Sequence, residues 1–234
     1  MRVAKIAIVS ILVGVGLLVV GWYGAKARSF QVFGDLSSRV ETERRVVALT
    51  FDDGPHPGAL SELLPMLRDR GVKATFFVTG AELQRYPELG AALVAEGHEL
   101  GNHTYSHRRM VLKSQAFIAS EIESTDALIR ATGQAGRIHF RPPYGVKGIG
   151  LPRYLADTGR RTIMWDVEPD SDAKVASSSD AIVAHVMARA RPGSIILLHV
   201  MYPSRRTSLE AVPGIVDGLR SQGYEFVTVS ELVQ

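Results

Sequence analysis

The sequence has no cysteine among its 234 residues, and this absence removes several classes of chemistry at once. Disulfide bonds, thiolate metal ligands and cysteine nucleophiles are all excluded. The hydrophobic fraction of 46% is ordinary for a globular domain with a sizeable core. The length suggests one domain with an appendage.

Acidic residues are missing from positions 1 to 28, which contain four basic side chains. The remainder of the chain holds 23 basic and 24 acidic residues, a net charge of −1, although the whole chain has a formal charge of +3. The basic excess therefore belongs to the N-terminus. No basic stripe in the rest of the chain indicates a nucleic-acid partner.

Charged residues are also missing from Ile6 to Ala25, a stretch of 20 residues rich in Ile, Val, Leu and Gly. As a helix it would rise roughly 30 Å, the thickness of the hydrocarbon core of a bilayer. Ala25-Lys26-Ala27 could serve as a signal-peptide cleavage site, but the apolar stretch is long for a signal peptide and favours an uncleaved transmembrane anchor. We therefore expect a single-pass protein of the bacterial inner (cytoplasmic) membrane with its domain on the outer side, or else a domain secreted after cleavage near Ala27.

Strand-like and helix-like segments alternate after this N-terminal segment (residues 1–28) and a short linker (residues 29–44). Expected strands lie at residues 46–51, 74–78, 98–102, 137–141, 161–165, 195–199 and 226–229. Expected helices lie at residues 60–70, 81–96 with an interruption at Pro87, 114–131, 151–158, 180–190 and 209–221. The alternation predicts one α/β domain at residues 45–234, with a largely parallel sheet, open or closed into a barrel. Functional residues of such folds gather at the carboxyl ends of the strands.

Two adjacent carboxylates follow the first expected strand, in Asp52-Asp53-Gly54-Pro55. Such a tetrapeptide is often only a turn, because Asp, Gly and Pro are all turn residues. Two like charges at a strand end repel one another, however, unless a cation lies between them. The pair is therefore a candidate functional site.

His103 and His107 are four residues apart and follow the expected strand at residues 98–102. On a helical turn this spacing would place both imidazoles on one face, within reach of one ion. The pair alone is a weak motif. Together with one carboxylate it would form a three-ligand metal site that leaves positions open for water and substrate.

Three further segments place polar residues after expected strands. Arg141-Pro142-Pro143-Tyr144 could be only a rigid proline turn, and His199 could be a partly buried structural histidine. The stretch after Trp165 carries four acids, at positions 166, 168, 170 and 172. An acid close to a histidine would raise the pKa of that histidine and keep it protonated at neutral pH.

These five segments, taken in their order along the chain with the stretch after Trp165 before His199, resemble the motifs of the NodB-like polysaccharide deacetylases, carbohydrate esterase family 4. The resemblance spans nearly all of the chain after the N-terminal segment. It implies a distorted (β/α) barrel of about seven strands, fewer than the eight of a complete (β/α)₈ barrel. It also implies metal-dependent hydrolysis of acetamide groups on a GlcNAc-type polysaccharide of the cell envelope. The cofactor would be one divalent ion, Zn²⁺ or alternatively Co²⁺, Ni²⁺ or Mn²⁺.

The resemblance also implies a role for each segment. The metal ligands would be Asp53, His103 and His107. Asp52 would be the general base, oriented and kept ionised by Arg141, and His199 would be the acid that protonates the leaving amine. The backbone N–H of Tyr144 would help to stabilise the oxyanion. The walls of the acetyl pocket would be Trp165 and Leu197.

The stretch after Trp165 departs from the family pattern, which usually ends in Asp-Trp. When the motif is aligned from Trp165, that aspartate falls on Ser171 and the tryptophan on Asp172. Asp170 or Asp172 would then have to tune the pKa of His199, and the sequence leaves this choice open.

Other functions fit these residues less well. An O-acetyl esterase would use the same machinery, whereas a catalytically inactive sugar-binding relative should lack at least one motif residue. A non-haem iron oxygenase would leave Asp52, Arg141 and His199 without a role.

The expected partners are an N-acetylated polysaccharide or oligosaccharide and, through the N-terminal helix, the membrane. Peptidoglycan, a chitin-like oligosaccharide, an exopolysaccharide and a lipid-linked glycan are all open as the substrate, and nothing in the sequence indicates an oligomeric state.

Overall fold

The computed structural model describes residues 14, 16, 19 and 21–234. Within that part of the chain, none of the helices combines the length and the hydrophobicity needed to cross a membrane. Most of the anchor expected at residues 6–25 lies outside the described residues, so the anchor stays a prediction.

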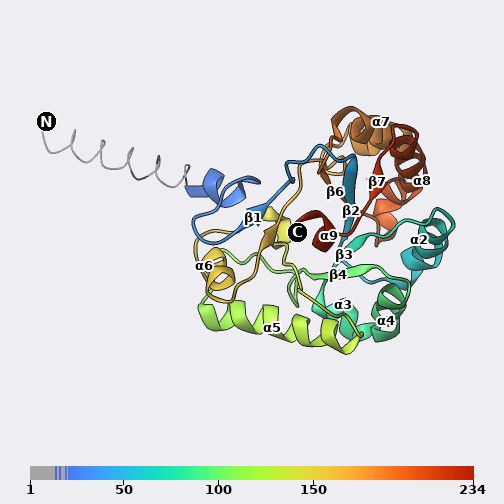
Figure 1. The fold of residues 1–234 in the computed structure, drawn as a ribbon. Helices are drawn as coiled ribbons and strands as arrows, with labels where there is room; N and C mark the ends of the chain where they lie inside the picture. Colours follow the sequence, from blue (N-terminus) through green and yellow to red (C-terminus); the bar gives the residue numbers. More distant parts are fainter. Residues whose placement is uncertain (1–13, 15, 17–18, 20) are drawn as a thin grey trace, which may run out of the picture.

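A parallel β-sheet forms the centre of the domain (Figure 1). Its strands are β2 (Val46–Asp52), β3 (Thr75–Val78), β4 (Glu99–Asn102), β6 (Ile195–His199) and β7 (Glu225–Phe226). β2 has β3 and then β4 on one side and β6 on the other, and β7 pairs with the first residues of β2. Every strand pair in this sheet is parallel. The predicted α/β fold with a largely parallel sheet is confirmed.

Helices alternate with the strands along the chain. They are α2 (Pro57–Asp69), α3 (Gly80–Arg85), α4 (Pro87–Ala95), α5 (Gln115–Ala131), α6 (Gly150–Asp157), α7 (Ser179–Arg189), α8 (Arg206–Ser221) and α9 (Val229–Leu232). Local sequence explains several of their ends. Tyr86 separates α3 from α4, whose first residue is a proline, so the expected interruption at Pro87 is confirmed. The Oγ of Ser114 caps α5, whereas Thr228 caps α9 and shortens the strand expected at residues 226–229.

A second, two-stranded sheet pairs β1 (Leu36–Ser37) with β5 (Thr162–Ile163). Isolated bridges connect Asn102 with Phe140, Phe140 with Thr162, and Val167 with Ile196. The strand expected at residues 137–141 is reduced to the bridge at Phe140, because Pro142 and Pro143 follow and have no N–H to extend a ladder. The regular ladders therefore form an open sheet and a short ribbon. The closed barrel of about seven strands is not confirmed.

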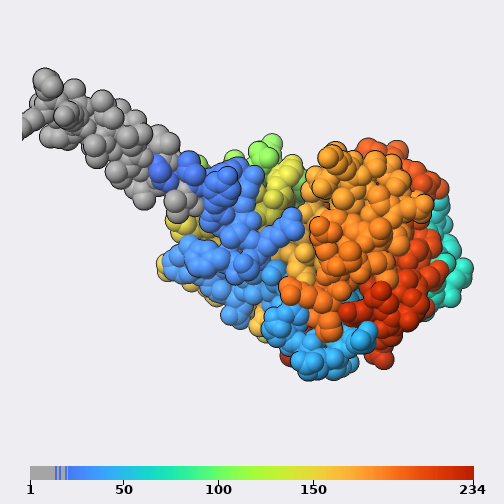
Figure 2. All heavy atoms as spheres, turned by 90° about the horizontal axis from the view of Figure 1, so that it is seen from above, coloured from blue at the N-terminus to red at the C-terminus, as the bar shows by residue number. Residues whose placement is uncertain are grey.

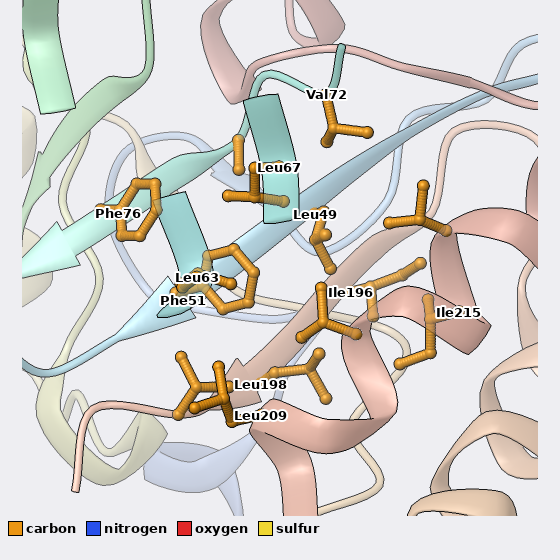
Figure 3. Packing of buried hydrophobic residues seen from close by; sticks show 14 of the residues in the cluster. Leu49, Phe51, Leu63, Leu67, Val72, Phe76, Ile196, Leu198, Leu209 and Ile215 are labelled. Carbon is orange, nitrogen blue, oxygen red and sulfur yellow. The ribbon is translucent and has the colours of Figure 1, made fainter. Parts of the chain in front are cut away.

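The largest hydrophobic core lies between the sheet and the helices α2 and α8 (Figure 3). Its members include Leu49, Phe51, Leu63, Leu67, Ile196, Leu198, Leu209 and Ile215, all of them buried. Burial of each such side chain contributes about 1.5–3 kcal/mol relative to leaving it exposed. This packing holds β2 against β6, so that their last residues, Asp52 and His199, lie opposite each other in register.

Candidate active site at the carboxyl ends of the strands

The carboxyl ends of β2, β4 and β6 bring the predicted site residues to one edge of the sheet. Asp52 is the last residue of β2 and pairs in register with His199, the last residue of β6. Asp53 follows directly, and His103 is the first residue after β4. Polar residues that follow parallel strands converge at this edge, which is where α/β folds place their functional sites.

Asp53, His103 and His107 form a cluster of metal-binding side chains. One potential ligand atom from each residue lies within 4.8 Å of the other two. Oδ1 of Asp53 is 3.4 Å from Nε2 of His107 and 3.9 Å from Nε2 of His103. One carboxylate and two imidazoles are a donor set that suits a divalent ion, and three protein ligands leave a position for water or substrate. These residues therefore fit a catalytic metal ion.

His103 is held in the form that binds metals. Burial, with a further contribution from the neighbouring His107, lowers the pKa of His103 to about 3, so its imidazole is neutral at physiological pH. Nδ1 of His103 lies 2.8 Å from the carbonyl oxygen of Arg141. A carbonyl oxygen can only accept a hydrogen bond, so Nδ1 must carry the proton. In this tautomer of the neutral imidazole, Nε2 keeps a free lone pair. Nε2 is the atom that faces the cluster.

The loop that carries both histidines is not the helical turn considered from their spacing. Thr104 has a φ of 66° and His107 a φ of 55°, both in the left-handed region. Residues other than glycine adopt this conformation only where their surroundings hold them there. The Asn102 side chain accepts a hydrogen bond from the N–H of Thr104 at 2.8 Å, and Glu121 accepts bonds from the N–H and Oγ of Ser106. These hydrogen bonds therefore hold the loop in the conformation that brings the two imidazoles together.

Asp52 lies beside the cluster and pairs with Arg141. Nη1 of Arg141 donates to Oδ1 of Asp52 at 2.6 Å and to Oγ1 of Thr50 at 2.8 Å. Arg141 is completely buried, and its guanidinium carbon lies 4.0 Å from the centroid of the Phe77 ring. The second carboxylate oxygen of Asp52, Oδ2, is 3.6 Å from Nε2 of His103. Asp52 thus directs one oxygen to its cation and the other to the metal-binding cluster.

His199 approaches the same site from β6 and has Asp170 as its partner. Nδ1 of His199 is 3.4 Å from Oδ2 of Asp170, which also accepts a bond from the backbone N–H of His199 at 2.5 Å. Burial lowers the pKa of His199, but the hydrogen bond to Asp170 and the charges of the two strand-end aspartates outweigh burial and raise it above 6.5. Asp172 is exposed and accepts bonds from the backbone of its own turn instead. Of the two acids left open by the sequence, Asp170 is the one that contacts His199.

A cavity of about 460 Å³ opens over these groups. Its lining includes most of the predicted residues, namely Asp52, Asp53, His103, His107, Tyr144, Trp165 and His199. Tyr144 lies in a turn with a φ of 59°, and the centroid of its ring is 4.7 Å from that of His107. Arg141 lies behind Asp52, and Leu197 is buried in the core beside Trp165. Those two residues support the lining without belonging to it.

The cavity lining also contains four charged residues that the sequence did not single out for the site. They are Lys26, Arg28, Glu168 and Arg205. In the sequence, Lys26 and Arg28 are the basic flank of the hydrophobic segment, and no local pattern connects Arg28 with a residue 140 positions further on. Glu168 is one acid among four. The feature of the sequence that could have pointed to Glu168 is its position three residues after Trp165, because the indole N–H of Trp165 donates to Glu168 at 2.9 Å.

Comparison with known proteins gives consistent matches. Residues 39–163 match the family model described as polysaccharide deacetylase. A peptidoglycan-N-acetylglucosamine deacetylase of Bacillus cereus is 33% identical over 201 residues, which cover 86% of this chain and 94% of the relative. A chitooligosaccharide deacetylase of a Bradyrhizobium species is 35% identical over 212 residues, with coverage of 86% and 94%. The structure of Bacillus subtilis PdaA, a family 4 carbohydrate esterase, has a TM-score of 0.76 at 29% identity, covering 85% of each chain.

These matches agree with the order of the motifs along the sequence and with the parallel sheet. Deacetylases of carbohydrate esterase family 4 depend on a metal ion, and the cluster at Asp53 offers a set of ligands for one. They hydrolyse the amide bonds of acetylated polysaccharides, so the chain is a hydrolase of carbon–nitrogen bonds other than peptide bonds. The chain belongs to the polysaccharide deacetylases, the NodB-like enzymes of carbohydrate esterase family 4.

Proposed function

We propose that this enzyme removes N-acetyl groups from a GlcNAc-type polysaccharide of the bacterial cell envelope and that a zinc ion assists the reaction. The observation that carries the proposal is one cavity onto which a buried carboxylate, a metal-binding cluster and a histidine of raised pKa all open. Amide hydrolysis needs an activated water, an electrophilic aid and a proton for a poor leaving group. The relatives named for peptidoglycan and for chitooligosaccharide support an N-acetylated glycan as the substrate.

Asp53, His103 and His107 would hold the ion. Zn²⁺ suits this donor set, and Co²⁺, Ni²⁺ and Mn²⁺ are the alternatives. When bound, such an ion supplies Lewis-acid polarisation of the acetamide carbonyl and lowers the pKa of water to about 7.

Asp52 would accept the proton of the attacking water. Its Oδ2 lies on the side of the metal-binding cluster, whereas its Oδ1 is held by Arg141. The role of Arg141 is to fix the direction of the carboxylate. A general base positioned in this way typically contributes about 10² to 10⁴ in rate.

His199 would donate a proton to the leaving nitrogen, which would otherwise depart as an unstable anion. Its raised pKa, due to Asp170, keeps a larger fraction of the imidazole protonated near neutral pH. The backbone N–H of Tyr144 would donate to the oxyanion. Trp165 would form one wall of the acetyl pocket, and Leu197 would support Trp165 from the core.

The test is acetate release from a panel of N-acetylated glycans, with and without a chelator. We expect release from at least one of them, loss of the activity with the chelator, and recovery when zinc is added. Release from O-acetylated sugars only would assign an O-acetyl esterase instead. An inactive sugar-binding protein would bind glycan and release no acetate even with metal present. Full activity of Asp53→Ala would contradict the proposed metal site.

We also propose that residues 1–28 anchor the enzyme in the cytoplasmic membrane, and that the linker 29–44 leads to the catalytic domain 45–234 on the outer side. The support is the uncharged stretch from Ile6 to Ala25. Membrane fractionation tests the anchor, because an uncleaved protein should leave the membrane only with detergent. A soluble protein whose N-terminus is Arg28 would contradict it.

A further inference from the structure

Residues 25–28, which follow the hydrophobic stretch, are bound to the catalytic domain. The carbonyl oxygen of Ala25 accepts a hydrogen bond from the backbone N–H of Lys147 at 2.9 Å. The carbonyl oxygen of Ala27 accepts one from Nζ of the same lysine at 2.5 Å. Ala25 is itself buried. Figure 2 shows the blue residues of this part of the chain lying against the body of the domain.

Lys147 is the residue that donates to both of these carbonyl oxygens. Its side chain is only 1% exposed, and burial lowers the pKa of its ammonium to about 8. Among the described residues, the carbonyl oxygen of Ala27 is the one acceptor found for that ammonium. A charged donor at a buried position needs an acceptor, and the carbonyl oxygen of Ala27 supplies it while the segment is in place.

Arg28 extends the attachment to the wall of the active-site cavity. Nη2 of Arg28 is 2.7 Å from Oε2 of Glu168, whose side chain is only 4% exposed. The indole N–H of Trp165 donates to the same oxygen at 2.9 Å, and Oγ of Ser171 donates to Oε1 at 2.5 Å. The guanidinium carbon of Arg28 also lies 5.0 Å from the centroid of the Trp165 ring. One arginine therefore holds both the acid and the indole in place.

The groups that Arg28 holds are connected to the catalytic side chains. The Trp165 ring centroid lies 5.5 Å from the guanidinium carbon of Arg141, the residue that binds Asp52. Two residues after Glu168, the same loop carries Asp170, the partner of His199. Lys26 and Arg28 line the cavity together with these catalytic residues. The segment before the domain therefore contributes two side chains to the lining of this cavity.

We propose that residues 25–28, held by Lys147, are a permanent wall of the substrate pocket and that Arg28 is the positioning residue that fixes Trp165 through Glu168. The enzyme then works with its N-terminal segment attached, and cleavage after Ala27 would damage the pocket. This inference rests on the proposed function, because it assigns the wall a role in binding the substrate.

Kinetics of full-length variants test the role of Arg28. Arg28→Gln should raise KM about three- to fivefold, the range for loss of a partly exposed ion pair, while kcat changes little because Asp52 and His199 are untouched. Arg28→Lys should recover most of the loss, since a single guanidinium nitrogen makes the contact with Glu168. Arg44→Gln, in the linker outside the cavity lining, is the matched control. A KM for Arg28→Gln equal to that of the control overturns the proposal.

A double-mutant cycle separates positioning through Glu168 from a general loss of structure. The double variant Arg28→Gln/Glu168→Gln should have the same KM as Glu168→Gln alone, because Arg28 acts on Trp165 through Glu168. Independent, multiplying effects overturn the proposal.

A measurement without substrate distinguishes failure of this inference from failure of the proposed function. The chain has two tryptophans, so Trp22→Phe leaves Trp165 as its only indole fluorophore. In that background, Arg28→Gln should increase the quenching of Trp165 by acrylamide, because the ring loses the group that holds it. Unchanged quenching overturns the inference whether or not acetate is released.

The mass of the active protein completes the test. We expect the active form from the native host to retain Ala25, Lys26 and Ala27. A form that begins at Arg28 and has the same KM as the uncut enzyme overturns the proposed wall.

Discussion

Arg141 and Asp52 form a fully buried ion pair at the boundary between the core and the catalytic cavity. Their closest atoms, Nη1 and Oδ1, are 2.6 Å apart, and the side chains are 0% and 3% exposed. The guanidinium also donates to Thr50 and to the main-chain carbonyls of Ile163 and Met164. A single buried cation thus connects β2, β5 and the proposed general base.

This pair predicts an unusually large stability effect for Arg141→Met. The variant leaves Asp52 as a buried charge without its partner, which should cost about 3–5 kcal/mol of unfolding free energy. Arg70→Met is the control, because its pair with Asp217 is partly exposed and should contribute at most about 1 kcal/mol. Denaturant unfolding of both variants is the measurement. Equal losses of unfolding free energy in the two variants would show that the buried Arg141–Asp52 pair stabilises the fold no more than the surface Arg70–Asp217 pair does.

Asp52→Asn should separate catalysis from metal binding. Asparagine keeps the size of the side chain and an oxygen that can accept from Arg141, but it cannot take a proton from water at neutral pH. We expect kcat to fall about 10²- to 10⁴-fold with little change in KM. The bound metal should stay at one equivalent, measured by elemental analysis. Loss of the metal would instead make Asp52 a ligand, since its Oδ2 is also close to Nε2 of His103.

Asp53→Asn should weaken metal binding itself. Mutations of groups that only orient a ligand typically lower affinity by about 10- to 100-fold, so loss of a ligand charge should lower zinc affinity by more than about 100-fold. Calorimetric titration of the metal-free protein with zinc measures this directly. Asp172→Asn changes an aspartate outside the cluster and should bind zinc like the wild type. Equal affinities of the two variants would remove Asp53 from the metal site.

The position of the site could be predicted from the sequence because strand ends are visible in it. Apolar runs that stop at Asp52 and His199 mark two neighbouring strands, and parallel pairing places their carboxyl ends at one edge. The resemblance to a family then gave each polar residue an expected role. The structure brings the carboxylate and both imidazoles of the expected cluster together.

Three features could not be predicted because they depend on contacts distant in sequence or on backbone conformation. Thr104 and His107 adopt positive φ values, which no spacing rule indicates, so the helical turn considered for the two histidines was wrong. Arg28 contacts Glu168, which is 140 positions further along the chain. From the sequence alone, its positive charge is already explained by its place beside the expected membrane anchor. The choice between Asp170 and Asp172 likewise required the path of the loop, which turns only Asp170 toward His199.

The partnership of Asp170 with His199 predicts a specific change in the pH profile. His199 must be protonated to donate to the leaving nitrogen, so activity is lost as pH rises through its pKa. Because the hydrogen bond to Asp170 and the charge of Asp52 raise that pKa against the opposing effect of burial, the wild type keeps activity to a higher pH. Asp170→Asn removes a raising contribution and leaves the burial, so the alkaline limb of kcat should move to lower pH. Asp172→Asn removes an exposed carboxylate that makes no contact with His199, and its alkaline limb should stay in place. A shift of equal size in both variants would point to the general charge of the acidic loop and would remove Asp170 as the specific partner of His199.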